Sequence, residues 1–185
     1  MKRCVIFFLL VLSILFVNSM ALAEEQVVVF YEGFEDYEEG TRPDGWNNVG
    51  GTTWYVSTLQ AQAGQKSFFI EDTTEEAYIG AISPSISVSP NTTYTVAFWA
   101  MTTDDTESQG HIGVLIEGVS EWLYVPDDRP LEWTLATLTF TTSSTTESIK
   151  IRLYPTARGG AGAMGWAWYD EIYLVEGEEF VPPQP

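Results

Sequence analysis

The chain is poor in cysteine, in histidine and in basic residues, and each shortage narrows its chemistry. Its 185 residues include one cysteine and one histidine, against seven tryptophans and nine tyrosines. Cys4 falls in an N-terminal segment that we expect to be removed, so disulfides and thiol chemistry are excluded from the remaining chain. Eight Lys and Arg residues oppose 26 Asp and Glu residues. This acidity argues against nucleic acid and anionic membrane surfaces as partners, because both require a basic face.

The first 23 residues have the pattern of a cleaved signal peptide. Met1-Lys2-Arg3 is a short basic start, residues 4–17 form an apolar run, and Ala21 and Ala23 are the small residues that a signal peptidase recognises. The apolar run is shorter than the roughly 20 residues of a membrane-spanning helix, which disfavours a retained anchor. We therefore expect a secreted (extracellular or periplasmic) protein without membrane attachment. Removing the two charges of Lys2 and Arg3 takes the formal net charge from −18 to −20.

After residue 24 no long segment shows a helical hydrophobic period. Short runs alternate between apolar and polar residues instead, with turn residues between them. This pattern predicts an all-β fold, a β-sandwich jelly roll of two antiparallel sheets over residues 25–176. The acidic, proline-containing residues 177–185 are expected to form a flexible tail. The expected strands are residues 27–34, 53–57, 67–71, 81–88, 93–102, 111–118, 132–141, 148–154 and 166–175.

Alternation within these runs separates core-facing from outward-facing side chains. Tyr94, Val96 and Phe98 share one parity and are expected in the core, which leaves Trp99 facing outward. An outward tryptophan on a strand indicates a binding surface, although a covering loop would also explain it. The same argument places other side chains outward on two further strands, namely His111, Leu115, Glu117, Lys150, Arg152 and Tyr154.

Several short motifs follow one another along the chain, namely Gly33-Phe34-Glu35, Pro43-Asp44-Gly45-Trp46, Gly64-Gln65-Lys66-Ser67, Ile82-Ser83-Pro84, Tyr94 to Trp99, and Trp168 to Leu174. Their order resembles the jelly-roll carbohydrate-binding modules of families 4, 9, 16 and 22, whose fold is galactose-binding-like. Adhesin-type and MAM-like jelly rolls of secreted surface proteins are also similar, so an adhesion module with a cell-surface protein partner is the alternative.

Non-catalytic carbohydrate binding is the function that this resemblance implies. Aromatic rings stack on the C–H faces of sugars, and charged side chains hydrogen-bond the hydroxyls. A jelly roll is expected to bring the strands of Trp99, Glu117 and Arg152 into one sheet, where a polysaccharide or oligosaccharide would bind. The expected ligand-binding residues are Trp99, Arg152, Glu117, Tyr154, Trp122 and Tyr124, with Lys150, Trp54 and Tyr55 as further contributors; Trp46, Trp133 and Trp168 are expected in the core.

The resemblance also implies a structural Ca²⁺ site that joins the first and last strands. Its ligands would be the backbone carbonyls of Gly33 and Lys66 and the carboxylates of Glu35 and Asp170. Ca²⁺ accepts about six to eight oxygen ligands of both kinds. Asp170 has the parity of Ile172 and is therefore expected to point inward, where a carboxylate without a partner is costly. Two interpretations stay open, because either a cation or backbone N–H donors would stabilise Asp170.

Few features of the sequence indicate catalysis. The mature chain has a single histidine and lacks a Gly-x-Ser-x-Gly elbow and a zinc-type histidine cluster. We therefore expect a protein that is not an enzyme. Acidic pairs are abundant, so a polysaccharide-acting enzyme with two carboxylates is a second alternative.

Overall fold

The computed structural model describes residues 26–50, 53–73, 79–103, 111–127, 129–157 and 164–183, and the expected signal peptide lies outside these ranges. All regular elements in the described ranges are β-strands. None of the described residues belongs to a helix long and apolar enough to cross a membrane. The all-β prediction is therefore confirmed.

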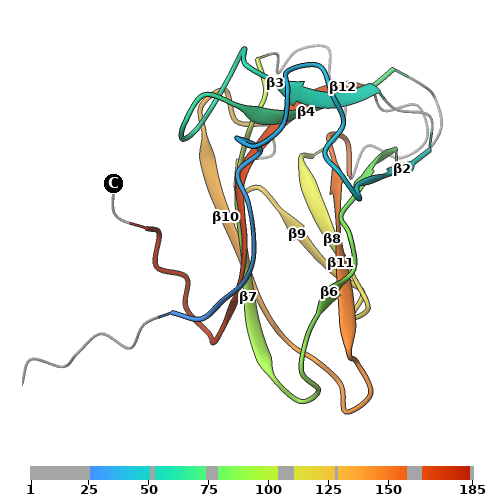
Figure 1. Cartoon of the computed structure of the whole chain (residues 1–185), viewed down its shortest axis with the longest axis vertical. Helices are drawn as coiled ribbons and strands as arrows, with labels where there is room; N and C mark the ends of the chain where they lie inside the picture. The colour runs from blue at the N-terminus through green and yellow to red at the C-terminus, as the bar shows by residue number, and fades with distance from the viewer. Residues whose placement is uncertain are drawn as a thin grey trace, which may run out of the picture.

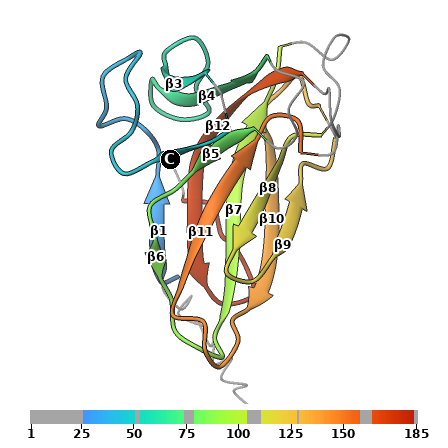
Figure 2. The same cartoon turned by 90° about the vertical axis from the view of Figure 1, so that its right-hand side faces the viewer.

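The strands form two antiparallel sheets that pack face to face as a jelly roll (Figure 1). The first sheet has the order β10-β7-β12-β4-β3, with β1 also pairing with β12. The second sheet has the order β2-β5-β11-β8-β9, with β6 also pairing with β11, and Figure 2 looks onto it. The strands are β1 (Val28–Glu32), β2 (Asn47–Val49), β3 (Thr53–Ser57), β4 (Ser67–Asp72), β5 (Gly80–Ile82), β6 (Ile86–Ser87), β7 (Thr93–Met101), β8 (Gly113–Glu117), β9 (Glu121–Tyr124), β10 (Thr134–Thr141), β11 (Ser148–Tyr154) and β12 (Gly165–Glu176).

Strand β1 ends at Glu32, earlier than the sequence pattern predicts, because Phe34 has a left-handed backbone with φ 61°. This conformation is uncommon for a residue with a side chain. It turns the Phe34 ring into the core, with ring centroids 4.9 Å from Phe68 and 6.0 Å from Trp46. The following residue, Glu35, is thereby directed away from the core towards a neighbouring loop.

The run expected as one strand over residues 81–88 is divided into β5 and β6 by Ser83 and Pro84. Pro84 has no backbone N–H with which to continue the ladder. The hydroxyl of Ser83 accepts a hydrogen bond from the backbone N–H of Ile151 at 2.9 Å instead. The short strands β2 and β9 were not among the expected strands, and both lie in the second sheet.

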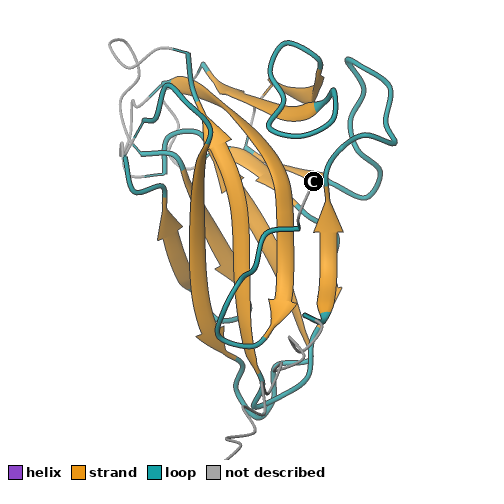
Figure 3. Cartoon of the chain, turned by 90° about the vertical axis from the view of Figure 1, so that its left-hand side faces the viewer, coloured by secondary structure: helices purple, strands orange, loops and turns teal. Residues whose placement is uncertain are grey.

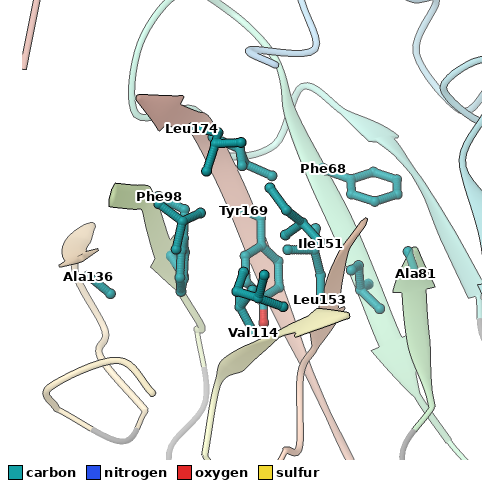
Figure 4. Close-up of a cluster of buried hydrophobic side chains, with 14 of the residues drawn as sticks. Phe68, Ala81, Phe98, Val114, Ala136, Ile151, Leu153, Tyr169 and Leu174 are labelled. Carbon is teal, nitrogen blue, oxygen red and sulfur yellow. The ribbon is translucent and has the colours of Figure 1, made fainter. Parts of the chain in front are cut away.

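The core fills the space between the sheets, as alternation predicts. Val96 and Phe98 of the first sheet and Val114, Ile151 and Leu153 of the second are all fully buried. Figure 4 shows Phe98, Val114, Ile151 and Leu153 meeting between the two layers. The outward parity of residues 115, 117, 150, 152 and 154 follows directly from this packing.

Tyr169 of β12 fastens the two sheets together at the end where β8 begins and β11 ends. Its ring is fully buried, and its hydroxyl donates to the carbonyl oxygens of Tyr154 at 2.7 Å and Gly113 at 3.1 Å. Burial raises the pKa of Tyr169 above its ordinary value, so the hydroxyl stays protonated as a donor.

Replacing Tyr169 by phenylalanine is expected to lower the free energy of unfolding by about 1–3 kcal/mol, because two buried carbonyls lose their donor. Urea denaturation of the variant measures this loss. Tyr55→Phe is the matched control, since Tyr55 is half-buried on β3 of the same sheet. Equal stabilities of the two variants would contradict the role of the Tyr169 hydroxyl.

Residues 177–183, which we call the C-terminal strap, fall within the segment expected to form a flexible tail. They lie on the outer side of the first sheet (Figure 3). Phe180 packs against Trp99 and Tyr173, with ring centroids 5.9 Å and 5.1 Å away. Thr95 donates a hydrogen bond to the carbonyl of Gly177 at 2.9 Å. The ring of Phe180 therefore anchors the strap on the first sheet. The acidic and proline-rich composition of the segment does not predict this packing.

Candidate functional site

Five outward side chains form one straight row across the second sheet. Strand register pairs Asn47 with Ile82, Ile82 with Arg152, Arg152 with Leu115, and Leu115 with Trp122. Directly opposed residues of antiparallel strands project from the same face. The row therefore crosses β2, β5, β11, β8 and β9 on the face that points away from the core. We call it the transverse row.

Aromatic rings gather at the β9 end of the transverse row. The Trp122 ring lies 5.3 Å from that of Tyr154 and 5.8 Å from that of Tyr124, to which it is parallel within 2°. His111 meets Tyr124 edge-on at 6.0 Å. Gly113 is the register partner of both tyrosines, and a side chain there would crowd Tyr124. Because Gly113 has no side chain, the rings of Tyr154 and Tyr124 can approach the indole of Trp122.

A charged pair lies beside these rings. The guanidinium of Arg152 forms an ion pair and a hydrogen bond with the carboxylate of Glu117, and the two side chains are 31% and 38% exposed. A hydrogen bond with Tyr154, followed by that with Glu117, raises the pKa of Arg152 and keeps it charged. Lys150 is the register partner of Glu117. The site thus offers fixed donors and an acceptor next to an aromatic surface.

The structure brings together five of the six expected ligand-binding residues, namely Arg152, Glu117, Tyr154, Trp122 and Tyr124. The sixth is a correction. Trp99 lies on β7, which pairs with β10 and β12 in the first sheet, so it is on the opposite side of the sandwich from Arg152. Its outward parity is right, but consecutive strands β7 and β8 belong to different sheets. The expectation of one shared sheet is therefore wrong.

Sequence predictions also concern four other tryptophans and Tyr55. Trp46 is buried as expected, and Trp133 is half-buried. Trp168 is buried as well, but it is the register partner of Phe69 and Met101 and so lies on the outer face of the first sheet rather than in the core. Trp54 faces the core on β3, where its ring meets Phe68 at 5.5 Å, and Tyr55 packs on Phe69 at 5.1 Å. Neither Trp54 nor Tyr55 contributes to the second sheet.

Sequence reasoning missed Asn47 and Ile82 as parts of the site. Asn47 lies on a three-residue strand with no alternating pattern, and Ile82 looks like an ordinary core residue. Only the register of β2, β5 and β11 places them on the outer face beside Arg152. The asparagine after the Asp44-Gly45 turn was the one available signal.

The expected metal ligands Glu35 and Asp170 hold the same loop from two sides. One carboxylate oxygen of Glu35 accepts hydrogen bonds from the backbone N–H groups of Gln65 at 2.8 Å and Lys66 at 2.7 Å. Asp170 accepts from the backbone N–H groups of Gln62 at 2.8 Å and Ala63 at 3.2 Å. The two carboxylates therefore converge on residues 62–66.

Asp170 does not point inward as the sequence parity predicts. A β-bulge lies between Asp170 and Tyr173, and Glu171 within it has φ 51°. The extra residue reverses the parity, so Asp170 is the register partner of Trp99 on the outer face of the first sheet. It is nevertheless fully buried, because the loop of residues 62–63 covers it. The prediction that Asp170 points inward is therefore wrong, although its carboxylate is buried.

Gly33 and Lys66 complete the expected metal-ligand set. A side chain on Gly33 would meet the hydroxyl of Tyr31 and the carboxylate of Glu171, so both side chains would have to move. The Lys66 ammonium donates to the carbonyls of Glu35 and Tyr37, each at 2.7 Å. In the part of the chain that the structure describes, no three His, Cys, Asp or Glu side chains cluster closely enough to hold a metal on their own. Any cation at this end would rely on backbone carbonyls as well.

Comparison with known proteins identifies the family and the fold of the chain. A family model described as a carbohydrate binding domain, CBM_4_9, matches residues 26–159. No curated protein matches the chain. The CBM22-1 xylan-binding domain of Paenibacillus barcinonensis Xyn10C is a similar solved structure, with a TM-score of 0.59, 17% identity, and coverage of 83% of this chain and 97% of that one.

Two further solved structures share the fold. The C-terminal family 22 carbohydrate binding module of Clostridium thermocellum Xyn10B has a TM-score of 0.56 and 15% identity, over 84% of this chain and 96% of that one. A family 16 carbohydrate binding module has a TM-score of 0.54 and 21% identity, over 72% and 92%. These structural likenesses confirm the jelly-roll fold. Because the family model covers most of that jelly roll, the chain belongs to the carbohydrate binding domain family CBM_4_9.

Proposed function

We propose that the outer face of the second sheet binds a neutral polysaccharide, whose chain lies across the strands along the transverse row. The observation that carries this proposal is the register that aligns Asn47, Arg152 and Trp122 on one face. Neighbouring strands are about 4.8 Å apart, so the four intervals of the row span about 19 Å. A surface of this length and straightness suits an extended chain rather than a single sugar.

The chemistry of the row matches that of a sugar chain. Trp122 and Tyr124 offer apolar ring surface for the C–H faces of pyranose rings. Arg152 and Glu117 are preorganised donor and acceptor for hydroxyl groups, because each holds the other in place. The net charge of −18 repels acidic polysaccharides and so favours a neutral ligand. Xylan is the first candidate, since similar structures are described as xylan-binding domains.

Binding without catalysis is the activity that this face supports. Glycoside hydrolysis in most families needs two carboxyl groups on either side of the scissile bond. The carboxylate of Glu117 forms an ion pair and a hydrogen bond with Arg152, which directs it towards the guanidinium rather than towards a sugar carbon. We propose that the chain is exported through its N-terminal segment and acts outside the cell or in the periplasm. Incubation with soluble xylan followed by reducing-sugar measurement tests the non-catalytic assignment, which release of sugar would contradict.

The affinity for β-linked xylo-oligosaccharides is expected to rise with length up to about four sugar residues and then to level off. The reason is that the transverse row spans about 19 Å, and only chains of that length cover it from end to end. Isothermal titration with xylobiose to xylohexaose measures the series. Full affinity for a disaccharide would show that the ligand occupies only part of the row.

We also propose that Ca²⁺ binds where residues 62–66 meet Glu35 and Asp170. The chain fits such an ion, because Asp170 is fully buried, accepts only backbone N–H donors among its described hydrogen bonds, and has no basic side chain among them. Burial, only partly offset by these hydrogen bonds, raises its pKa to about 7. The carboxylates of Glu35 and Asp170 and the carbonyls of Gly33 and Lys66 would hold the ion. Its role would be structural, fastening β1 and the loop to β12.

A further inference from the structure

The first sheet carries a small apolar cluster on its outer face, separate from the core. Ala97 of β7 and Tyr173 and Val175 of β12 are buried there, with Trp99 and Leu135 packed beside them. The cluster is buried because Phe180 of the C-terminal strap covers it. Trp99 therefore occupies an outward position, as a binding tryptophan would, but the chain's own strap lies over it.

The strap is held by one aromatic ring and by hydrogen bonds, among them one from the backbone N–H of Gly177 to the carbonyl of Thr93 at 2.9 Å. Phe180 is its one aromatic anchor, whereas Glu178 and Glu179 are exposed and Val181 is 61% exposed. Its backbone bonds to side chains, including Thr139 to the carbonyl of Glu178 at 3.1 Å and Gln26 to that of Glu179 at 2.6 Å. Segments with so little buried apolar surface open at low free-energy cost.

The strap also begins at a hinge. Gly177 has φ +114°, a conformation that residues with side chains rarely adopt, and nothing surrounds the position of its absent side chain. A glycine in open space at the end of a long strand lets the following segment swing without disturbing β12. Opening would therefore leave the sheet intact.

An opened strap would expose a surface with the chemistry of a saccharide site. Trp99 and Tyr173 would present ring faces, and the exposed Tyr31 extends them because its ring lies 4.7 Å from that of Tyr173. The hydroxyls of Thr95 and Thr139 now donate to strap carbonyls and would become available to sugar oxygens. The strap thus occupies the donors and the ring surface that a sugar would use.

We propose that this outer face of the first sheet is a second binding surface for a neutral saccharide, closed by the C-terminal strap. Phe180 acts as an internal competitor for the Trp99 surface, so the affinity of the second surface is reduced by the fraction of time that the strap is closed. The surface is independent of the transverse row, which lies on the opposite side of the sandwich.

The test uses the full chain with binding at the transverse row weakened by Trp122→Ala. Adding Phe180→Ala is expected to increase retardation by soluble xylan, mixed-linkage β-glucan or galactomannan in affinity electrophoresis, with about a tenfold gain in affinity. Adding Trp99→Ala to that double variant should abolish the gain. Binding lost with Trp99 supports the second surface whether or not the transverse row itself binds sugar.

Three outcomes would overturn the proposal. The first is a folded Trp122→Ala/Phe180→Ala chain that no panel polysaccharide retards. The second is a gain that survives Trp99→Ala. The third is self-association of the double variant in size-exclusion chromatography without sugar binding, which would make the face a protein interface. If circular dichroism shows that Phe180→Ala does not fold, Phe180→Leu removes the ring while keeping an apolar side chain, and the same outcomes apply to it.

Discussion

Replacing Asp170 by alanine is expected to lower the free energy of unfolding by about 3 kcal/mol or more. Three backbone N–H groups, those of Gln62, Ala63 and Glu171, lose their acceptor in a buried place. Each unsatisfied buried donor costs about 1–3 kcal/mol. Asp127→Ala is the control, because Asp127 is an exposed acidic residue. Urea denaturation in chelator measures both variants, and equal losses would contradict the buried role of Asp170.

Calcium is expected to stabilise the wild-type chain and not an Asp170→Asn variant. At about 100 times its dissociation constant, a bound ion adds about 2.7 kcal/mol to the free energy of unfolding. Asparagine keeps an acceptor for the loop N–H groups but removes the charge that a cation requires. Thermal unfolding with calcium and with chelator gives the increment for each protein. A wild-type midpoint that does not change after exhaustive metal removal would disprove the calcium site.

The pH dependence of stability distinguishes stabilisation of Asp170 by a bound cation from stabilisation by backbone N–H donors. Because burial raises the pKa of Asp170 to about 7 from its ordinary value of 3.8, the metal-free folded chain favours the protonated form. The contribution of Asp170 to the free energy of unfolding therefore rises as pH falls through about 7, and it is fully present below about pH 4. Bound calcium favours the charged carboxylate, so the calcium increment should shrink over the same fall in pH. A calcium increment that is constant between about pH 8 and about pH 5 would contradict coordination by Asp170.

Trp122→Ala is expected to weaken binding of soluble xylan by about 1–3 kcal/mol, which is a factor of about 5 to 150. The substitution removes the ring at the end of the transverse row and also exposes the Tyr154 ring that it contacts. Trp99→Ala is the matched control, since it removes the same side chain from the opposite sheet. Affinity electrophoresis compares the two, and a larger loss with Trp99→Ala than with Trp122→Ala would place the site on the first sheet.

The sequence predicts the sandwich well because its strands alternate strictly where one face is buried. Tyr94, Val96 and Phe98 are all in the core, and the outward residues of β8 and β11 are on the outer face. Local pattern decides these features, since a one-residue shift would turn the whole apolar set towards solvent. The same reasoning found Glu117, Arg152 and Tyr154 as outward residues.

Other features depend on pairing between distant segments, which alternation does not encode. Trp99 and Glu117 lie on consecutive long strands, yet the strands belong to different sheets. Asp170 changes face because of a bulge at Glu171 that has no proline or glycine to mark it. Phe180 follows a glycine in an acidic segment, and only the apolar patch on the first sheet explains why it packs there.

Tryptophan indole N–H signals in a titration followed by nuclear magnetic resonance provide the most direct test of the binding face. The chain has seven tryptophans, each with one such signal, which substitution of single residues assigns. During titration with xylohexaose, we expect the Trp122 signal to shift with saturation, while those of Trp46 and Trp168 stay in place. A saturable shift at Trp99 with none at Trp122 would contradict the assignment of polysaccharide binding to the second sheet.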